Sequence, residues 1–132
     1  MGFSDDDVTG ERSHPAGPDI WVAVLWGAVV TIGWAPVAAA FMASVYRFPI
    51  PFGGYARGVT DAVSAALASA FYLVVGGVVP LALAGAAAGF LLARGTGRGR
   101  ARCLALIAAV GFGTACAGAL LLALLEYAIG PW

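Results

Sequence analysis

Three long apolar segments, at about 20–46, 62–93 and 103–129, constrain the fold of this chain more than any other feature. Each is longer than the roughly 20 apolar residues that an α-helix needs to cross a hydrocarbon core about 30 Å thick, and none carries a charge in its central portion. Because 61% of the 132 residues are hydrophobic and only 11% are charged, a water-soluble fold would leave large apolar patches exposed. The sequence therefore predicts an all-α integral membrane bundle of three transmembrane helices.

Residues 1–19 differ in composition from the rest of the chain. They are polar, carry an acidic run at residues 5–7 together with glycines and prolines, and show no hydrophobic periodicity. This composition predicts a disordered tail over 1–19, followed by a transmembrane domain over 20–132. A cleaved signal peptide does not fit, because the leader is acidic and the first apolar run is far longer than the apolar core of a signal peptide.

The middle segment is longer than one crossing requires. A straight helix over 62–93 would span about 48 Å, so it must tilt, protrude or bend. The sequence GGVVP predicts a kink, because Pro80 lacks a backbone donor and clashes with the carbonyl of Gly76. Two short crossings or a re-entrant hairpin are the alternatives, and either would bring residues 94–102 back to the side of residues 47–60.

The arginines predict the orientation in the membrane. With three crossings, one side receives Arg12 and a basic loop, and the other receives Arg47 and Arg57. The basic loop lies in the stretch ARGTGRGRARC and contains Arg94, Arg98, Arg100 and Arg102. Because basic residues favour the cytoplasmic side, we expect a cell-membrane protein with its N-terminus inside and its C-terminus outside. The alternative with two short crossings would place the basic loop outside the cell. The three-crossing arrangement is therefore favoured.

The basic loop also excludes two kinds of binding site. GTGRG is not a dinucleotide fingerprint, and the chain has no lysine that could complete a phosphate-binding P-loop. A net charge of zero argues against nucleic acid as a partner. Beside two membrane helices, the four arginines are expected to contact anionic lipid headgroups, each contributing about 1 kcal/mol.

Residues that carry chemistry are scarce. The central positions of the segments hold only mildly polar groups, Thr31, Ser69, Tyr72, Thr114 and Cys116. A charge near the bilayer centre costs at least about 2.5–3.5 kcal/mol and is usually functional, so its absence removes support for ion pumping and proton relay. His14 is the only histidine and lies in the tail, with no cysteine near it, and the chain offers no Ser–His or Cys–His pair with a plausible shared site. The sequence thus predicts no metal site, no cofactor and no enzyme.

Small residues at helical spacing provide a positive signal. The second segment contains GAAAG, with Gly85 and Gly89 four apart, and the third segment places Gly111, Ala115 and Gly118 at steps of four and three. Such stripes let helix backbones approach closely in lipid. We predict that they are helix-packing faces, either within one chain or against a partner.

The loop YRFPIPFGGYARGVT joins the first two segments. Its aromatic residues alternate with proline and glycine and are bracketed by Arg47 and Arg57. Interfacial anchoring is the expected role, and binding of a partner is the alternative. Near the end of the third segment we expect Glu126 to touch water, the alternative being a buried carboxylate paired with Arg47 or Arg57. Asp61 and Asp19 are expected to cap the second and first helices.

These features favour a membrane protein without catalytic chemistry that acts by helix packing, as an accessory or assembly subunit. The abundance of Ala, Gly, Pro and Arg indicates a GC-rich bacterial genome. The expected partners are the lipid bilayer and other membrane subunits or further copies of the chain. The alternative is a homo-oligomeric, holin-like pore, which would need a polar stripe or a hydrophobic gate. The polar stripe is nearly absent from the sequence.

Overall fold

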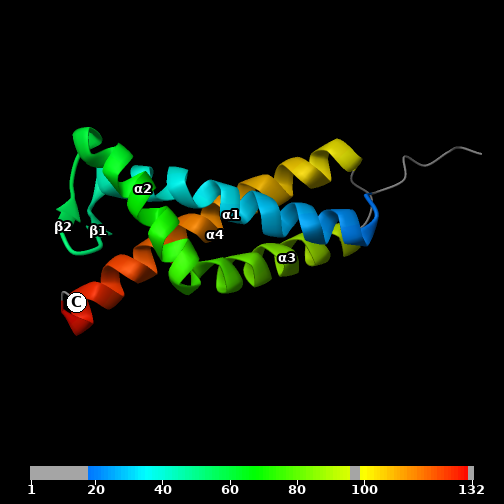
Figure 1. Ribbon diagram of the computed structural model, residues 1–132. Coiled ribbons are helices and arrows are strands. Elements are labelled where there is room, and N and C mark those ends of the chain that lie inside the picture. Colours follow the sequence, from blue (N-terminus) through cyan, green and yellow to red (C-terminus); the bar gives the residue numbers. More distant parts are fainter. Residues whose placement is uncertain (1–17, 96–98, 131–132) are drawn as a thin grey trace, which may run out of the picture.

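The structure is a computed structural model that describes residues 18–95 and 99–130. Most of the tail over 1–19 and Arg98 of the basic loop lie outside the described residues. Three helical segments in the described part are long and apolar enough to cross a membrane, Ile20–Val45, Val59–Arg94 and Arg100–Ile129. They run in alternating directions and form an elongated bundle (Figure 1), which confirms the predicted all-α three-helix architecture.

The elements follow the predicted segments closely. Their bounds are α1 Ile20–Val45, β1 Phe48–Ile50, β2 Gly54–Ala56, a 3-10 turn Val59–Asp61, α2 Ala62–Tyr72, a π-helical turn Leu73–Gly77, α3 Val78–Arg94 and α4 Arg100–Ile129. A short antiparallel hairpin, β1–β2, closes the end of the bundle where α1 finishes and α2 begins (Figure 1).

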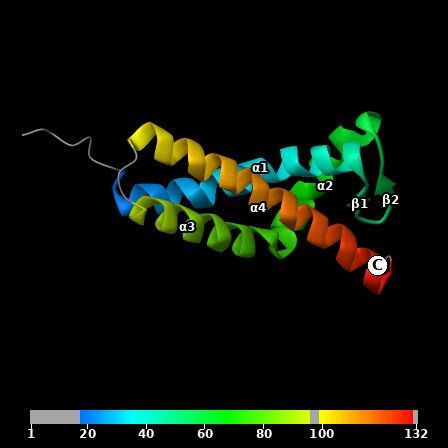
Figure 2. The ribbon, with the colours of Figure 1, turned by 180° about the vertical axis from the view of Figure 1, so that it is seen from behind.

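The middle segment is one bent helical segment. Its backbone is irregular at Gly76, where φ is 153° and ψ is −6°, a conformation that side chains disfavour. The predicted kink therefore lies in GGVVP, four residues before Pro80, where the proline ring displaces the helical hydrogen bond. Both ribbon views show α2 leading from the hairpin end to the middle of the bundle and α3 continuing to the opposite end (Figures 1 and 2). The chain does not turn back at the kink.

Helix α1 is the centre of the bundle and packs against α2, α3 and α4. Its buried face repeats small residues at steps of four, Ala23, Gly27, Thr31, Ala35, Ala39 and Ala43. A Cβ atom placed on Gly85 of α3 would overlap the carbonyl oxygen of Gly27, and one on Gly89 would overlap the carbonyl oxygen of Ala23. The two backbones are in direct contact, which is the close approach that small residues permit in lipid. We call this contact the α1–α3 seam.

Aromatic side chains also join α1 to α4. The ring of Trp34 meets Phe112 edge-on at 5.2 Å between centroids, and Phe41 contacts the same ring at 6.2 Å. Nearer the other end, the indole Nε1 of Trp26 donates a hydrogen bond of 3.3 Å to the carbonyl oxygen of Leu104. Helix α4 is thus held along much of its length by α1.

The hairpin was not predicted as strands. Its register pairs Phe48 with Ala56 and Ile50 with Gly54, and Phe48 and Ala56 are buried in a cluster of alanines from α1, α2 and α4. Part of the signal was present, since a Gly-Gly pair is common at hairpin turns, but the register places Gly54 in β2 and residues 51–53 in the turn. Burial of Phe48 under the hairpin anchors this loop to the bundle.

The expected side-chain caps are wrong. Asp61 precedes α2, but its carboxylate forms no capping bond and instead accepts a hydrogen bond of 3.1 Å from the backbone N–H of Arg57. Asp19 precedes α1 and also forms no side-chain capping bond. The Asp61 carboxylate therefore stabilises the turn that leaves the hairpin, and the helix that follows begins without a side-chain cap.

Candidate functional site

The five residues predicted for helix packing all lie at contacts within the chain. Gly85 and Gly89 form the α1–α3 seam, and Gly111 is so close to α1 that a Cβ atom there would lie 2.8 Å from Thr31 Oγ1. Ala115 is buried. Gly118 is half-buried, and a Cβ atom there would lie 3.6 Å from the side chain of Leu81 in α3. These residues therefore contribute to packing within the bundle.

A second stripe of small residues lies on the opposite side of α4. It consists of exposed residues at steps of four, Ala101, Ala105, Ala109, Gly113 and Ala117. A step of four residues keeps them on one side of the helix, over about 24 Å of its length. A Cβ atom on Gly113 would meet no described atom within 4 Å. We call this surface the exposed α4 stripe; Figure 2 shows α4 in front of α1, with its near side uncovered by the other ribbons.

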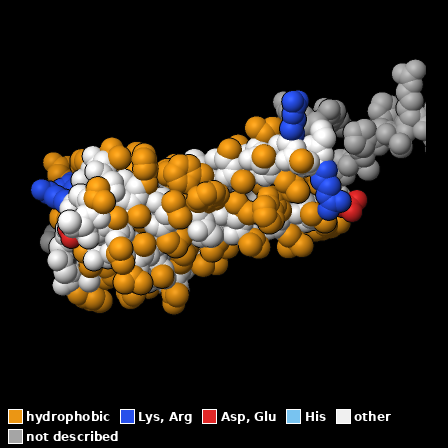
Figure 3. Space-filling view, turned by 90° about the horizontal axis from the view of Figure 1, so that it is seen from above, with side chains coloured by type: hydrophobic (Ala, Val, Ile, Leu, Met, Phe, Trp, Pro, Cys, Tyr) orange, Lys and Arg blue, Asp and Glu red, His pale blue; other side chains and the backbone are white. Residues whose placement is uncertain are grey.

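The exposed surface of α1 has the opposite character. Its exposed side chains are mostly bulky, Trp21, Leu25, Trp26, Val29, Val37, Phe41 and Val45. On the face drawn in Figure 3, hydrophobic side chains cover the length of the molecule and charged side chains gather at its two ends. This distribution is typical of a surface in contact with lipid. The exposed α4 stripe differs from the exposed surface of α1, because its side chains are small.

The basic loop lies at the end of the bundle opposite the hairpin. Arg94 ends α3, where its guanidinium carbon lies 4.5 Å from the centroid of the Phe90 ring. Arg100 and Arg102 are exposed in the first turn of α4, and Arg98 is outside the described residues. Figure 3 shows basic side chains at this end of the molecule.

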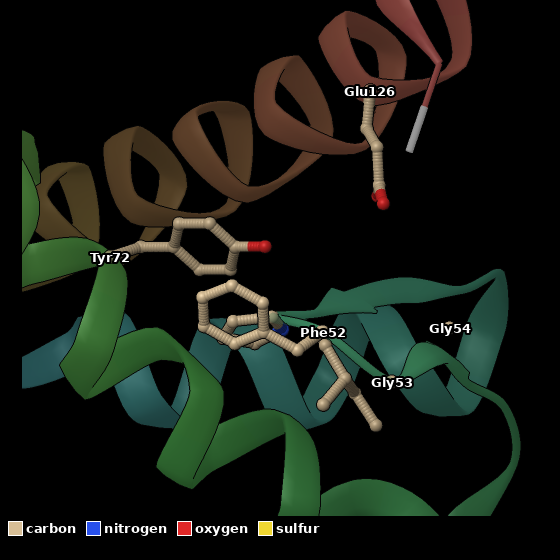
Figure 4. A pocket seen from close by; sticks show the side chains of 7 residues that line it. Phe52, Gly53, Gly54, Tyr72 and Glu126 are labelled. Atoms are coloured by element: carbon tan, nitrogen blue, oxygen red, sulfur yellow. The ribbon is translucent and has the colours of Figure 1, made fainter. Parts of the chain in front are cut away.

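The hairpin end holds a cavity that is lined by both polar and apolar residues. This hairpin pocket has a volume of about 210 Å³ and is lined by Ile50, Pro51, Phe52, Gly53, Gly54, Tyr72 and Glu126. The side chains of Tyr72, from the end of α2, and Glu126, from α4, point toward it (Figure 4). Glu126 is only 6% exposed, so the expectation of a carboxylate at the molecular surface is wrong.

Arg47 lies beside the hairpin pocket among three tyrosines. Its guanidinium carbon is 5.1, 4.7 and 5.3 Å from the ring centroids of Tyr46, Tyr55 and Tyr127. Within the described residues, neither Arg47 Nε nor Glu126 Oε2 has a hydrogen-bond partner, although both atoms are buried. The sequence alternative was a buried carboxylate paired with Arg47 or Arg57; the carboxylate is buried, but its Oε2 forms no hydrogen bond with either arginine. Cation–π contacts hold the guanidinium in place instead.

The sequence reasoning missed both the exposed α4 stripe and the hairpin pocket. The spacing of the stripe is visible in the sequence, but its residues are offset by two positions from the buried series that includes Gly111 and Ala115. The pocket has a weaker signal, because it forms only when the hairpin folds over the end of α4. Comparisons with protein-family models, with curated proteins and with solved structures find no match to this chain.

Proposed function

We propose that this chain is a non-enzymatic accessory or assembly subunit that binds a helix of another membrane protein, or of a second copy, through the exposed α4 stripe. The supporting observation is the pair of small-residue faces on α4. One face packs against α1. The other face has the same residue types and spacing, but no element of the described residues covers it. Small residues at this spacing allow backbone contact between helices in lipid.

The proposed orientation follows from the charges at the two ends. The described arginines of the basic loop would lie in the cytoplasm of a bacterial cell, with the N-terminus beside them and the hairpin outside. Arg94, Arg100 and Arg102 would contact anionic lipid headgroups there. A pore is less well supported, because the exposed stripe is apolar and the hydroxyl of Thr114 is bonded to the carbonyl oxygen of Val110 in its own helix, at 2.8 Å.

The test compares two glycines without close neighbours, one on the exposed α4 stripe and one on another helix. Gly113 is on the exposed α4 stripe and Gly33 is on the exposed surface of α1, and a Cβ atom on either would meet no described atom within 4 Å. Gly113→Leu should abolish the complex seen by native mass measurement after mild extraction, because the leucine side chain holds the two backbones apart. Gly33→Leu should leave the complex intact.

Three outcomes would contradict the proposal. A complex that survives Gly113→Leu and Ala109→Leu would mean that the stripe contacts lipid only. If the unaltered protein is a monomer under all mild extraction conditions, the exposed α4 stripe binds no partner helix. A closed homo-oligomer that conducts ions would favour the pore over the accessory subunit.

A further inference from the structure

The hairpin pocket contains a carboxyl group that no described residue satisfies. Glu126 is 94% buried, its side chain points toward the pocket (Figure 4), and its Oε2 atom has no hydrogen-bond partner in residues 18–95 and 99–130. Buried carboxyl groups normally have a partner, because removing them from water alone is costly. The carboxyl group lines the adjoining cavity, so a cation bound there would lie beside it as its counter-ion.

The cations of the hairpin end do not fill this role. Arg47 is held over its three tyrosine rings, and its Nε is itself buried without a hydrogen-bond partner among the described residues. Arg57 is exposed. The guanidinium of Arg47 adds positive potential near Glu126 without bonding to Oε2. No described residue therefore forms a hydrogen bond to Oε2.

The walls of the pocket are aromatic. Tyr72 and Phe52 line it, and both rings meet Phe71 edge-on, at centroid distances of 5.7 and 6.2 Å. An organic cation is attracted to the faces of such rings within about 6 Å. One carboxyl group with aromatic walls is therefore a set of groups suited to an ammonium ion.

A hard metal ion fits this pocket less well. Calcium takes about 6–8 oxygen ligands, whereas no group of three His, Cys, Asp or Glu side chains occurs in the described part of the chain. The volume of about 210 Å³ is below the roughly 300–1,000 Å³ of pockets for drug-sized ligands. It suits a small headgroup.

We propose that the hairpin pocket binds an alkylammonium group, carried by a small amine or by a lipid headgroup, with Glu126 as the counter-ion and the rings of Tyr72 and Phe52 as its walls. Tyr72 would in addition offer its hydroxyl to a polar substituent of the ligand, since this group points toward the pocket (Figure 4). The inference does not depend on the proposed role of α4.

The backbone of the hairpin turn supports a binding role. Phe52 has a positive φ of 63°, an unfavourable conformation for a bulky residue that is commonly found where function requires it. Its side chain is 91% exposed at the tip of the hairpin, although it contacts Phe71 on one side. An ordered turn that presents an aromatic ring beside a buried carboxyl group places the two recognition elements together.

Binding is tested on the full-length protein in a sugar-based detergent, which has no ammonium group. Choline and ethanolamine are titrated calorimetrically, in parallel with dimethylbutanol, the neutral isostere of choline. We expect at least one of the two cations to bind at least about tenfold more tightly than dimethylbutanol, because only the cations form charge-assisted contacts. Equal affinity for all three probes would overturn the proposal and leave a pocket filled by water. If none of the probes binds, and no ammonium lipid is retained in the reconstitution experiment described below, the proposal is likewise overturned.

Substitutions then assign the roles. Glu126→Gln should weaken binding of the cation at least about tenfold, and Tyr72→Leu about threefold, because it removes one aromatic wall. Asp19→Asn removes a carboxylate at the opposite end and should leave the affinity unchanged. Unchanged affinity in Glu126→Gln would contradict the proposal. If that variant does not fold, the comparison of choline with dimethylbutanol in the unaltered protein decides.

Lipid and free amine are distinguished by reconstitution. The protein is placed in nanodiscs of phosphatidylglycerol containing a minor fraction of phosphatidylethanolamine or phosphatidylcholine, and retained lipids are identified by native mass spectrometry. Retention of an ammonium lipid that Glu126→Gln abolishes would identify a headgroup site. Calorimetric binding without such retention would identify a site for a free amine. Absence of both would refute the inference.

Discussion

The two small-residue faces of α4 have nearly the same chemistry and opposite surroundings. The buried face, with Gly111, Ala115, Ala119 and Ala123, lies on the bundle side of the helix, with Gly111 against Thr31 of α1. The exposed α4 stripe, from Ala101 to Ala117, has no described neighbour at all at Gly113. In lipid there is little hydrophobic gain from burying either face. Whether a small residue stabilises the protein therefore depends on the backbone that lies opposite it.

The largest difference between packed and open positions is expected at the α1–α3 seam. Gly85→Leu would drive a side chain into the backbone of Gly27 and the hydroxyl of Thr31. Overpacking typically costs about 1–3 kcal/mol, and backbone atoms cannot rotate away, so we expect a loss at the top of that range or failure to fold. The loss in the free energy of unfolding is measured by unfolding the protein in mixed detergent micelles. Stability unchanged from the parent protein would show that the seam is not closed.

A pair of alanines two residues apart separates the faces of α4 most directly. Ala115→Leu, on the buried face, should lower the free energy of unfolding by about 1–3 kcal/mol. Ala117→Leu, on the exposed stripe, should change it by no more than about 0.5 kcal/mol. Both are measured by the same micelle titration on the isolated chain. Equal effects would mean that the two faces are not distinguished in the way the structure indicates.

A small effect of opposite sign is expected from the hydroxyl in the centre of the bundle. Thr31 is fully buried, and its Oγ1 has no hydrogen-bond partner among the described residues. Thr31→Val removes an unsatisfied polar atom at similar size, so stability should stay the same or rise by up to about 1 kcal/mol. A loss greater than about 1 kcal/mol would instead assign the hydroxyl a partner, and would show that the contact between α1 and Gly111 is polar as well as close.

The sequence by itself determined the number of helices, their approximate bounds and the kink. Three uncharged apolar runs of sufficient length have few alternatives to helices in lipid, since every backbone group must be satisfied within the segment. The kink was predictable for an equally local reason, because Pro80 disturbs the turn before it and Gly76 can adopt the resulting conformation. These features depend on residues close to each other in the chain.

Only the tertiary structure decided which small residues face inward and what happens at the hairpin end. Both series on α4 have the same spacing, so the choice between them rests on the fit against α1, a helix about 80 residues away in the chain. The burial of Glu126 depends on the hairpin around Phe52, which must fold over α4 to enclose it. Such contacts join segments that are distant in sequence, and their free energy is set by the shapes of the two surfaces, which no local pattern of residues records.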